Sequence, residues 1–398
     1  MNEPKKLDLM ALASIPLIMT LANSMLIPVL PLMQRKLGIT TMQSSLIITV
    51  YAAVSIVCIP IAGYLSDRFG RKLIILIGLA LSAIGGGISA WSAWKLGHNS
   101  AYIGILTGRF IQGIGAAGAF PIVLPLVGDM FREKEELSSS LGMIETSNTF
   151  GKVLSPILGS TLAVFIWFLP LAVIPVICML SIVAVGMFVK VPKQNHQQSI
   201  EFIKFLHEIR SILKANGRWL FAIFSIGGIA MYIMFGVLYY LSSVLEERHG
   251  IDGIGKGELL AIPLGAICLA SFVCGKLIGS TKSKVKWYSV AGSVLLTISL
   301  GLILLAGTNQ LWLLLFLLTL AGAGIGFILP SLDALITEGT DKEQRGTISS
   351  MYSSMRFIGV AAGPLITSFL LHKENVMFSI FMGAGIICSA VSLFAIRK

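Results

Sequence analysis

The stretch GYLSDRFGRK, residues 63–72, places a cluster of charged side chains between two long apolar runs. The cluster comprises Asp67, Arg68, Arg71 and Lys72. Charge is scarce in the rest of the chain, because only 12% of the 398 residues are Asp, Glu, Lys or Arg, whereas 55% are hydrophobic. Charged residues make up about a quarter of a typical soluble domain, so this composition indicates a membrane protein.

Apolar runs of about 20 residues, long enough to cross roughly 30 Å of hydrocarbon, recur along the chain. We predict that twelve of them are membrane-spanning helices. Their expected bounds are 9–30, 43–65, 73–94, 101–128, 137–163, 165–189, 219–244, 258–280, 287–306, 310–335, 346–371 and 376–396.

The distribution of positive charge predicts the orientation of these helices. Most of the 30 Lys and Arg residues fall in segments that lie inside the cell if the N-terminus is cytoplasmic. Positively charged loops favour the cytoplasmic side, so we expect both termini there. The same asymmetry accounts for the net charge of +11 without a nucleic-acid partner. The five cysteines lack the spacing of a metal site, and we expect no bound metal.

Two segments of the chain, 106–160 and 316–368, repeat one pattern of residues. Pro121 in the first segment aligns with Pro330 in the second. A direct repeat of six helices is typical of transporters whose halves are related by an axis along the membrane normal. We therefore predict an all-α polytopic membrane protein built from two pseudo-symmetric six-helix bundles.

The predicted bundles occupy residues 1–189 and 219–398, joined by a cytoplasmic linker at 190–218. Apolar residues of the linker recur at helical spacing, opposite charged residues. This pattern predicts an amphipathic helix that lies on the membrane surface, with a partly ordered linker as the alternative.

The charged stretch at 63–72 resembles the loop signature of the major facilitator superfamily, G-x-x-x-D-R-x-G-R-K. This resemblance implies the major facilitator fold and a conformational latch that holds the cytoplasmic side closed. Its two glycines permit a close helix contact and a tight turn. The positions that the resemblance assigns to the latch are Gly63, Asp67, Arg68, Gly70, Arg71, Lys72 and Asp129. The second half departs from the pattern, because Gly279 stands where the repeat would place the aspartate, and Glu338 is the candidate for a weaker latch there.

The predicted span 137–163 contains FGKVLSPILGS, which resembles the antiporter motif G-x-x-x-G-P-x-x-G-G of exporters in this superfamily. Pro156 removes a backbone hydrogen bond and so favours a kink. Serines stand at two positions where glycine is usual. The resemblance implies the twelve-helix drug:proton antiporter branch and transport out of the cell. The motif positions are Gly151, Ser155, Pro156 and Gly159.

Charged residues inside the predicted spans are candidates for proton coupling, because such residues are costly in lipid. Glu145 shares one helix face with Asn148 and Lys152, and we favour it as the proton carrier; the alternative is a pair that neutralises itself with Lys or Arg. Arg109 begins an R-x-x-x-G motif that resembles a proton-transfer signature of the exporters, or else is a structural arginine. Asp333 is a weaker candidate.

Polar and aromatic residues of the predicted spans are candidates for lining a central substrate cavity. Aromatic side chains could supply an adaptable apolar surface, although most aromatic residues in membrane helices only pack. The candidate cavity residues are Asn23, Gln112, Asn148, Lys152, Tyr232, Tyr239, Tyr352 and Arg356.

These features predict a secondary transporter of the cell membrane, driven by the proton gradient and without a cofactor. We expect its partners to be a small-molecule substrate, protons and the lipid bilayer, and we expect a monomer. Amphiphilic drugs are the first candidate substrates; an anionic metabolite or lipid is the alternative, because cations outnumber firm anions among the candidate residues. An enzyme is disfavoured, since the five histidines lack metal-site spacing. A channel would need neither the repeat nor the latch.

Overall fold

The computed structural model describes residues 3–131, 134–190, 202–280, 284–339 and 345–396. Within these residues every long regular element is an α-helix, and no strand is present. The helices are α1 (Glu3–Ser24), η1 (Ile27–Val29), α2 (Leu30–Leu37), α3 (Thr41–Phe69), α4 (Arg71–Lys95), α5 (His98–Met130), α6 (Lys134–Phe165), α7 (Leu169–Phe188), α8 (Phe202–Glu247), α9 (Gly253–Ser280), α10 (Val285–Ala306), α11 (Leu311–Gly339), α12 (Arg345–Leu370) and α13 (Glu374–Phe394).

The chain divides into two compact units, Met1–Ile209 and Arg210–Lys398. The linker bounds predicted from the sequence, 190–218, stay a prediction. The helix expected inside this linker is the first part of α8, which continues without a break to Glu247. Residues 191–201 of the predicted linker lie outside the described residues.

The first predicted span, 9–30, lies within one stretch that can cross a membrane, Lys6–Leu37, but this stretch is not one continuous helix. α1 ends at Ser24, and the chain continues through the 3₁₀ turn η1 into α2. Pro28 and Pro31 lie just after this break. Because proline has no backbone N–H, these positions cannot continue the hydrogen bonding of α1, and the apolar composition of the stretch conceals the break.

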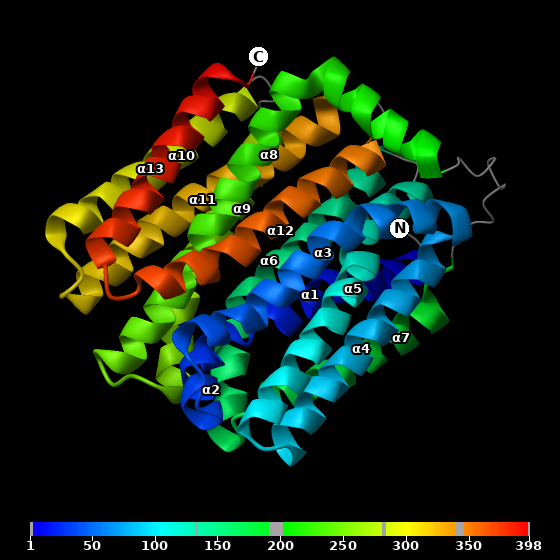
Figure 1. The fold of residues 1–398 in the computed structure, drawn as a ribbon. Coiled ribbons are helices and arrows are strands. Elements are labelled where there is room, and N and C mark those ends of the chain that lie inside the picture. Colours follow the sequence, from blue (N-terminus) through cyan, green and yellow to red (C-terminus); the bar gives the residue numbers. More distant parts are fainter. Residues whose placement is uncertain (1–2, 132–133, 191–201, 281–283, 340–344, 397–398) are drawn as a thin grey trace. The chain divides into compact units, whose positions relative to one another are not determined.

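Contacts between glycines bring neighbouring helices together in the same way in each unit. In the N-terminal unit α4 packs on α5, and a Cβ atom added at Gly78 would lie 2.6 Å from the carbonyl oxygen of Gly115. In the C-terminal unit α10 packs on α11, and a Cβ atom at Gly292 would lie 2.5 Å from the carbonyl oxygen of Gly324. Figure 1 shows α4 beside both α5 and α7. The predicted pseudo-symmetry is thus confirmed at the level of helix packing.

The same correspondence holds for α6 and α12. A Cβ atom at Gly159 of α6 would lie 2.1 Å from the carbonyl oxygen of Met25, next to the end of α1. A Cβ atom at Gly359 of α12 would lie 2.1 Å from the carbonyl oxygen of Gly228 in α8. Small residues therefore allow α6 to approach α1, and α12 to approach α8, at backbone distance.

Eleven stretches of the described chain are long and apolar enough to cross a membrane, which confirms a multi-pass membrane protein. The helix α6 has 32 residues and corresponds to the predicted span 137–163, but it is not among the eleven. Its polar residues, Glu145, Asn148 and Lys152 among them, lower its hydropathy. The helix with the antiporter-like motif is therefore a long helix that lies outside these eleven stretches.

Candidate functional site

Three of the predicted latch residues come together at one end of the N-terminal unit. The guanidinium of Arg71 lies 3.4 Å from a carboxylate oxygen of Asp67 and 3.1 Å from one of Asp129. Gly70, which links α3 to α4, has a φ of +100°, a conformation that other residues rarely adopt. The turn at Gly70 thus places Arg71 between two carboxylates from α3 and α5.

The other charged residues of this loop have different partners. Lys72 donates hydrogen bonds to the carbonyl oxygens of Gly186 and Val189, at 3.0 and 2.7 Å. These carbonyls end α7, so Lys72 caps a helix C-terminus, where a cation is favoured. Arg68 lies over the ring of Phe69, 5.3 Å from its centroid.

Gly63 and Glu338 are the remaining latch positions. Gly63 accepts a hydrogen bond from the Ser66 hydroxyl through its carbonyl oxygen, at 2.7 Å. Glu338 belongs to α11, and its side chain lies outside the described residues. Its role in the latch stays a prediction.

Arg109 is fully buried in the N-terminal unit and binds groups from three helices. Its Nε donates to the carbonyl oxygen of Ile47 at 2.8 Å, and Nη2 donates to Oδ1 of Asn23 at 2.6 Å. Its Nη1 donates to the carbonyl oxygen of Ala22 at 3.2 Å and to Oε1 of Gln112 at 2.9 Å. Arg109 therefore joins α1, α3 and α5.

These contacts explain how a buried cation is accommodated. The break in α1 after Ser24 leaves carbonyl oxygens near its end available, and Arg109 binds one of them at Ala22. The ring of Tyr51 lies 4.3 Å from the guanidinium carbon, close enough for a cation–π contact. Within the described part of the chain, all hydrogen-bond partners of Arg109 are neutral. The geometry gives Arg109 a structural role, and its predicted part in proton transfer stays a prediction.

A second polar network joins α6 to α1 around Glu145. The Asn148 side chain donates from Nδ2 to both carboxylate oxygens of Glu145, at 3.2 and 3.4 Å. Its Oδ1 accepts a hydrogen bond of 2.7 Å from the hydroxyl of Thr20 on α1. Within the described part of the N-terminal unit, the hydrogen-bond partner of the Glu145 carboxylate is the Asn148 amide. The half-buried carboxylate is held by an amide.

The remaining motif residues lie on the same helix, beyond Asn148. Lys152 is buried, with 8% of its surface exposed. The Ser155 hydroxyl donates to the carbonyl oxygen of Lys152 at 2.9 Å. Pro156 lies inside α6, and Gly151 faces Leu17 of α1, whose carbonyl oxygen would lie 3.2 Å from an added Cβ atom. The motif therefore forms the surface that packs on α1.

The C-terminal unit contains its own acid and base pair. An Nη atom of Arg356 on α12 lies 3.9 Å from a carboxylate oxygen of Asp333 on α11. The Arg356 guanidinium also lies 5.5 Å from the ring centroid of Tyr352, which stacks on Phe224 at 6.4 Å. Two predicted cavity residues and one predicted proton-coupling residue are thus neighbours.

The two other candidate tyrosines also lie in this unit, on α8. Tyr232 forms an edge-to-face contact with Phe381 of α13, with ring centroids 5.3 Å apart. Tyr239 is buried, with 2% of its surface exposed. Contact of these tyrosines with a substrate stays a prediction.

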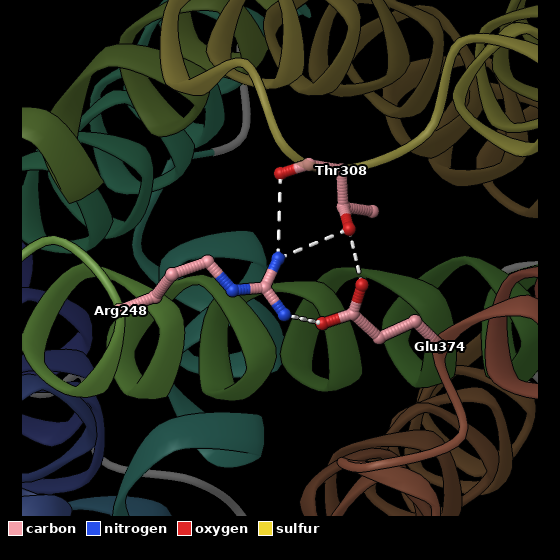
Figure 2. Close-up of polar contacts among 3 residues, drawn as sticks. All are labelled: Arg248, Thr308 and Glu374. Atoms are coloured by element: carbon pink, nitrogen blue, oxygen red, sulfur yellow. Dashed lines mark hydrogen bonds and ion pairs between the residues drawn. The ribbon is translucent and has the colours of Figure 1, made fainter.

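One cluster was not predicted from the sequence. Figure 2 shows Arg248, Thr308 and Glu374, which meet from three different connections of the C-terminal unit. The guanidinium of Arg248 forms an ion pair with Glu374 and donates to Oγ1 of Thr308 at 3.2 Å, and the Thr308 hydroxyl donates to Glu374. Burial lowers the pKa of Arg248, but the hydrogen bond and the negative charge of Glu374 outweigh it and raise this pKa above its ordinary value.

A buried ion pair joins α8 and α9 near Arg248 in the sequence. Nζ of Lys256, in the first turn of α9, lies 2.6 Å from a carboxylate oxygen of Glu246 in α8. Only 2% and 5% of these side chains are exposed. The predicted orientation places both groups of charges on the external side. In the sequence, both groups are marked only by charged residues beside short connections that are predicted to be external.

Comparison with known proteins gives one family and several relatives. A family model described as Major Facilitator Superfamily matches residues 12–364. The chain is 49% identical over 390 residues to the bacillibactin exporter of Bacillus subtilis, covering 98% of this chain and 95% of that protein. It is 24% identical over 387 residues to the quinolone resistance protein NorA of Staphylococcus aureus, covering 95% and 93% of the two chains.

A further relative is the multidrug resistance protein MdtG of Salmonella typhi, 27% identical over 364 residues, with 87% of this chain and 84% of that protein covered. Among solved structures, the human organic anion transporter MFSD10 matches with a TM-score of 0.74 at 16% identity, covering 98% of this chain and 100% of the other. That likeness concerns the fold alone. The repeated packing of glycines, the charged loop and the family match agree, and the chain belongs to the major facilitator superfamily as a multi-pass protein of the cell membrane.

Proposed function

We propose that this chain is a proton-driven antiporter that exports an amphiphilic small molecule by alternating access. Several relatives are named as exporters or resistance proteins, which supports transport out of the cell. The contacts of Arg71 with Asp67 and Asp129 support the proposal that this loop acts as a conformational latch. In this proposal the latch favours the state that is closed to the cytoplasm.

The observation that carries the proposal is the environment of Glu145. The carboxylate is half-buried on α6, and its partner is an amide group. A carboxylate paired with Lys or Arg would stay ionised, because a neighbouring cation favours the charged form. In this proposal the carboxylate that the Asn148 amide holds serves as the proton carrier.

Uptake into inverted membrane vesicles, whose lumen is acidified by respiration, tests this proposal. We expect bacillibactin or ethidium to accumulate inside, and a protonophore to abolish the accumulation. Glu145→Gln keeps the shape of the side chain and removes its titration, so accumulation of the transported probe should be lost. The control Glu258→Gln changes an exposed glutamate of α9 and should leave accumulation unchanged. Accumulation by the Glu145→Gln variant would contradict the proposal.

For the substrate class, the comparisons favour a siderophore over a drug. Identity to the bacillibactin exporter is 49%, against 24% to NorA and 27% to MdtG. The alternative substrate class is an anionic metabolite or lipid, which would include an anionic siderophore. Lys152, a buried cation on α6, supports this alternative because a cation attracts a negatively charged substrate. We expect Lys152→Gln to reduce transport of an anionic substrate and to spare that of ethidium. Equal loss for both probes would argue against recognition of negative charge.

A further inference from the structure

We infer that Thr20 is a positioning residue for proton coupling: its hydroxyl fixes the orientation of the Asn148 amide, and that amide presents its N–H groups to the Glu145 carboxylate. The inference rests on the proposed role of Glu145 as the proton carrier. It adds a residue on a second helix, α1, whose short polar side chain has no motif to mark it.

The first step is the direction of the hydrogen bonds. An amide side chain has a donor end and an acceptor end, and either end can face a given neighbour. The Thr20 hydroxyl donates to Oδ1 of Asn148 at 2.7 Å, which turns the acceptor end toward α1. Nδ2 then faces Glu145 and donates to its two carboxylate oxygens at 3.2 and 3.4 Å.

The second step is the effect on the proton. Hydrogen bonds donated to a carboxylate stabilise its charged form. If the Asn148 amide turned over, Oδ1 would face Glu145 and would accept a hydrogen bond only from the protonated carboxyl group. Thr20 therefore holds the amide in the orientation that donates to the carboxylate, although it does not touch the carboxylate itself.

The third step is the contact between helices that brings Thr20 into range. α1 and α6 pack on each other, and Gly151 of α6 faces Thr20, whose Cβ atom would lie 3.3 Å from a Cβ atom added at the glycine. The Ser147 hydroxyl donates to the carbonyl oxygen of Ala13 at 2.8 Å and fixes the same pair of helices. A shift of α1 against α6 would break the bond from Thr20 and release the amide.

Thr20→Val and Thr20→Ser separate this role from packing. Valine has nearly the shape of threonine but no donor, whereas serine keeps the hydroxyl. Thr107→Val is the matched control, because Thr107 is exposed on α5 and its hydroxyl donates to its own helix, at the carbonyl oxygen of Ile103. Each variant is purified as the full chain and reconstituted into proteoliposomes.

Two rates are measured with whichever of bacillibactin and ethidium the wild type transports. One is uptake driven by a pH gradient, and the other is exchange of labelled for unlabelled probe at equal pH, which needs no net proton transfer. We expect Thr20→Val to lose several-fold, at most about tenfold, in proton-driven uptake, the loss that follows from one hydrogen bond between neutral groups, and to keep exchange. Thr20→Ser and Thr107→Val should keep both rates.

The double variant Thr20→Val with Glu145→Gln provides the second measurement. If Thr20 acts through Glu145, the valine substitution should change neither rate further once the carboxylate is gone. Because Glu145→Gln already removes proton-driven uptake, exchange is the rate that reports here, and a loss of exchange in the double variant beyond that of Glu145→Gln would overturn the inference. So would equal loss of uptake and exchange in Thr20→Val, or failure of serine to restore uptake.

The failure of this inference and that of the proposed function are distinguishable. If Glu145→Gln abolishes proton-driven uptake while Thr20→Val leaves it intact, the positioning role is overturned and the proposed function stands. If Glu145→Gln retains proton-driven uptake, Glu145 is not the carrier, and the role of Thr20 falls with it.

Discussion

Arg109 illustrates how a single residue can be both costly and stabilising in a membrane protein. An ionised side chain inside the hydrocarbon region is unfavourable by several kcal/mol as a rough estimate. The fork of the guanidinium reaches oxygen atoms of α1, α3 and α5 at once, and four hydrogen bonds offset that cost. Its position at the break of α1 makes it part of the structure that fixes the helix end.

Arg109→Lys should therefore destabilise the protein although the charge is kept. The ammonium of lysine is a point donor on a flexible stem and cannot bind α1 and α3 together as the planar fork does. We expect a loss of about 2 kcal/mol, or roughly 4–8 °C in the melting temperature of the purified protein in detergent. Arg35→Lys, the same change at an exposed residue of α2, is the control. Equal melting temperatures would contradict the assignment.

At the scale of helices, close backbone contacts decide which pairs can form. Gly159 brings α6 against the carbonyl oxygen of Met25, and Gly359 brings α12 against that of Gly228. Lys72 connects α4 to α7, because its ammonium group caps the C-terminal end of α7. The antiporter-like motif thus contributes to helix packing in this protein, and Gly159 is the motif position where an added side chain would collide with backbone.

We expect Gly159→Ala to separate α6 from the end of α1. The added Cβ atom would lie 2.1 Å from the Met25 carbonyl oxygen, so the backbone of one helix has to move. Overpacking of this kind costs about 1–3 kcal/mol. Transport in proteoliposomes and the melting temperature should both fall. In Gly186→Ala, where no atom lies within 4 Å of the added group, the melting temperature should be unchanged or higher. Wild-type behaviour of Gly159→Ala would contradict the packing role.

The sequence predicted the helices well because hydropathy and glycine patterns are local, and it predicted less of the polar contacts. The break after Ser24 was missed, since its flanking residues are as apolar as those of a continuous span. Thr20 was missed because a lone threonine in a membrane helix usually bonds its own backbone. Glu374 and Arg248 are 126 positions apart, and no periodicity relates them.

At the scale of the C-terminal unit, the cluster of Arg248, Thr308 and Glu374 ties together the segments after α8, before α11 and at the start of α13. An exposed ion pair contributes only about 0–1 kcal/mol to the stability of a protein. The main effect of this cluster is therefore to hold the three segments in one arrangement. In an alternating-access transporter, such a tie makes the ends of these helices move together.

The single variants Arg248→Glu and Glu374→Arg should slow transport several-fold, because like charges then face each other across the tie. The double variant restores an ion pair of opposite polarity and should recover most of the rate. The maximal rate and the KM of proton-driven uptake are measured for all three proteins. We expect the maximal rate to change and the KM to stay the same. A double variant as slow as the singles would show that the pair does not couple these segments.

The polarity of α6 also bears on how the protein is made. Insertion of a helix into the membrane by the translocon costs about 2.5–3.5 kcal/mol for each ionised residue at the helix centre. The helix α6 carries two ionisable residues, Glu145 and Lys152. Such a segment partitions poorly into lipid alone during synthesis. The helix α1 is synthesised before α6 and carries hydrogen-bond partners for its polar residues. Thr20 bonds Asn148, and the Ala13 carbonyl oxygen accepts a hydrogen bond from Ser147. We therefore expect the insertion of α6 to be less efficient when α1 is absent.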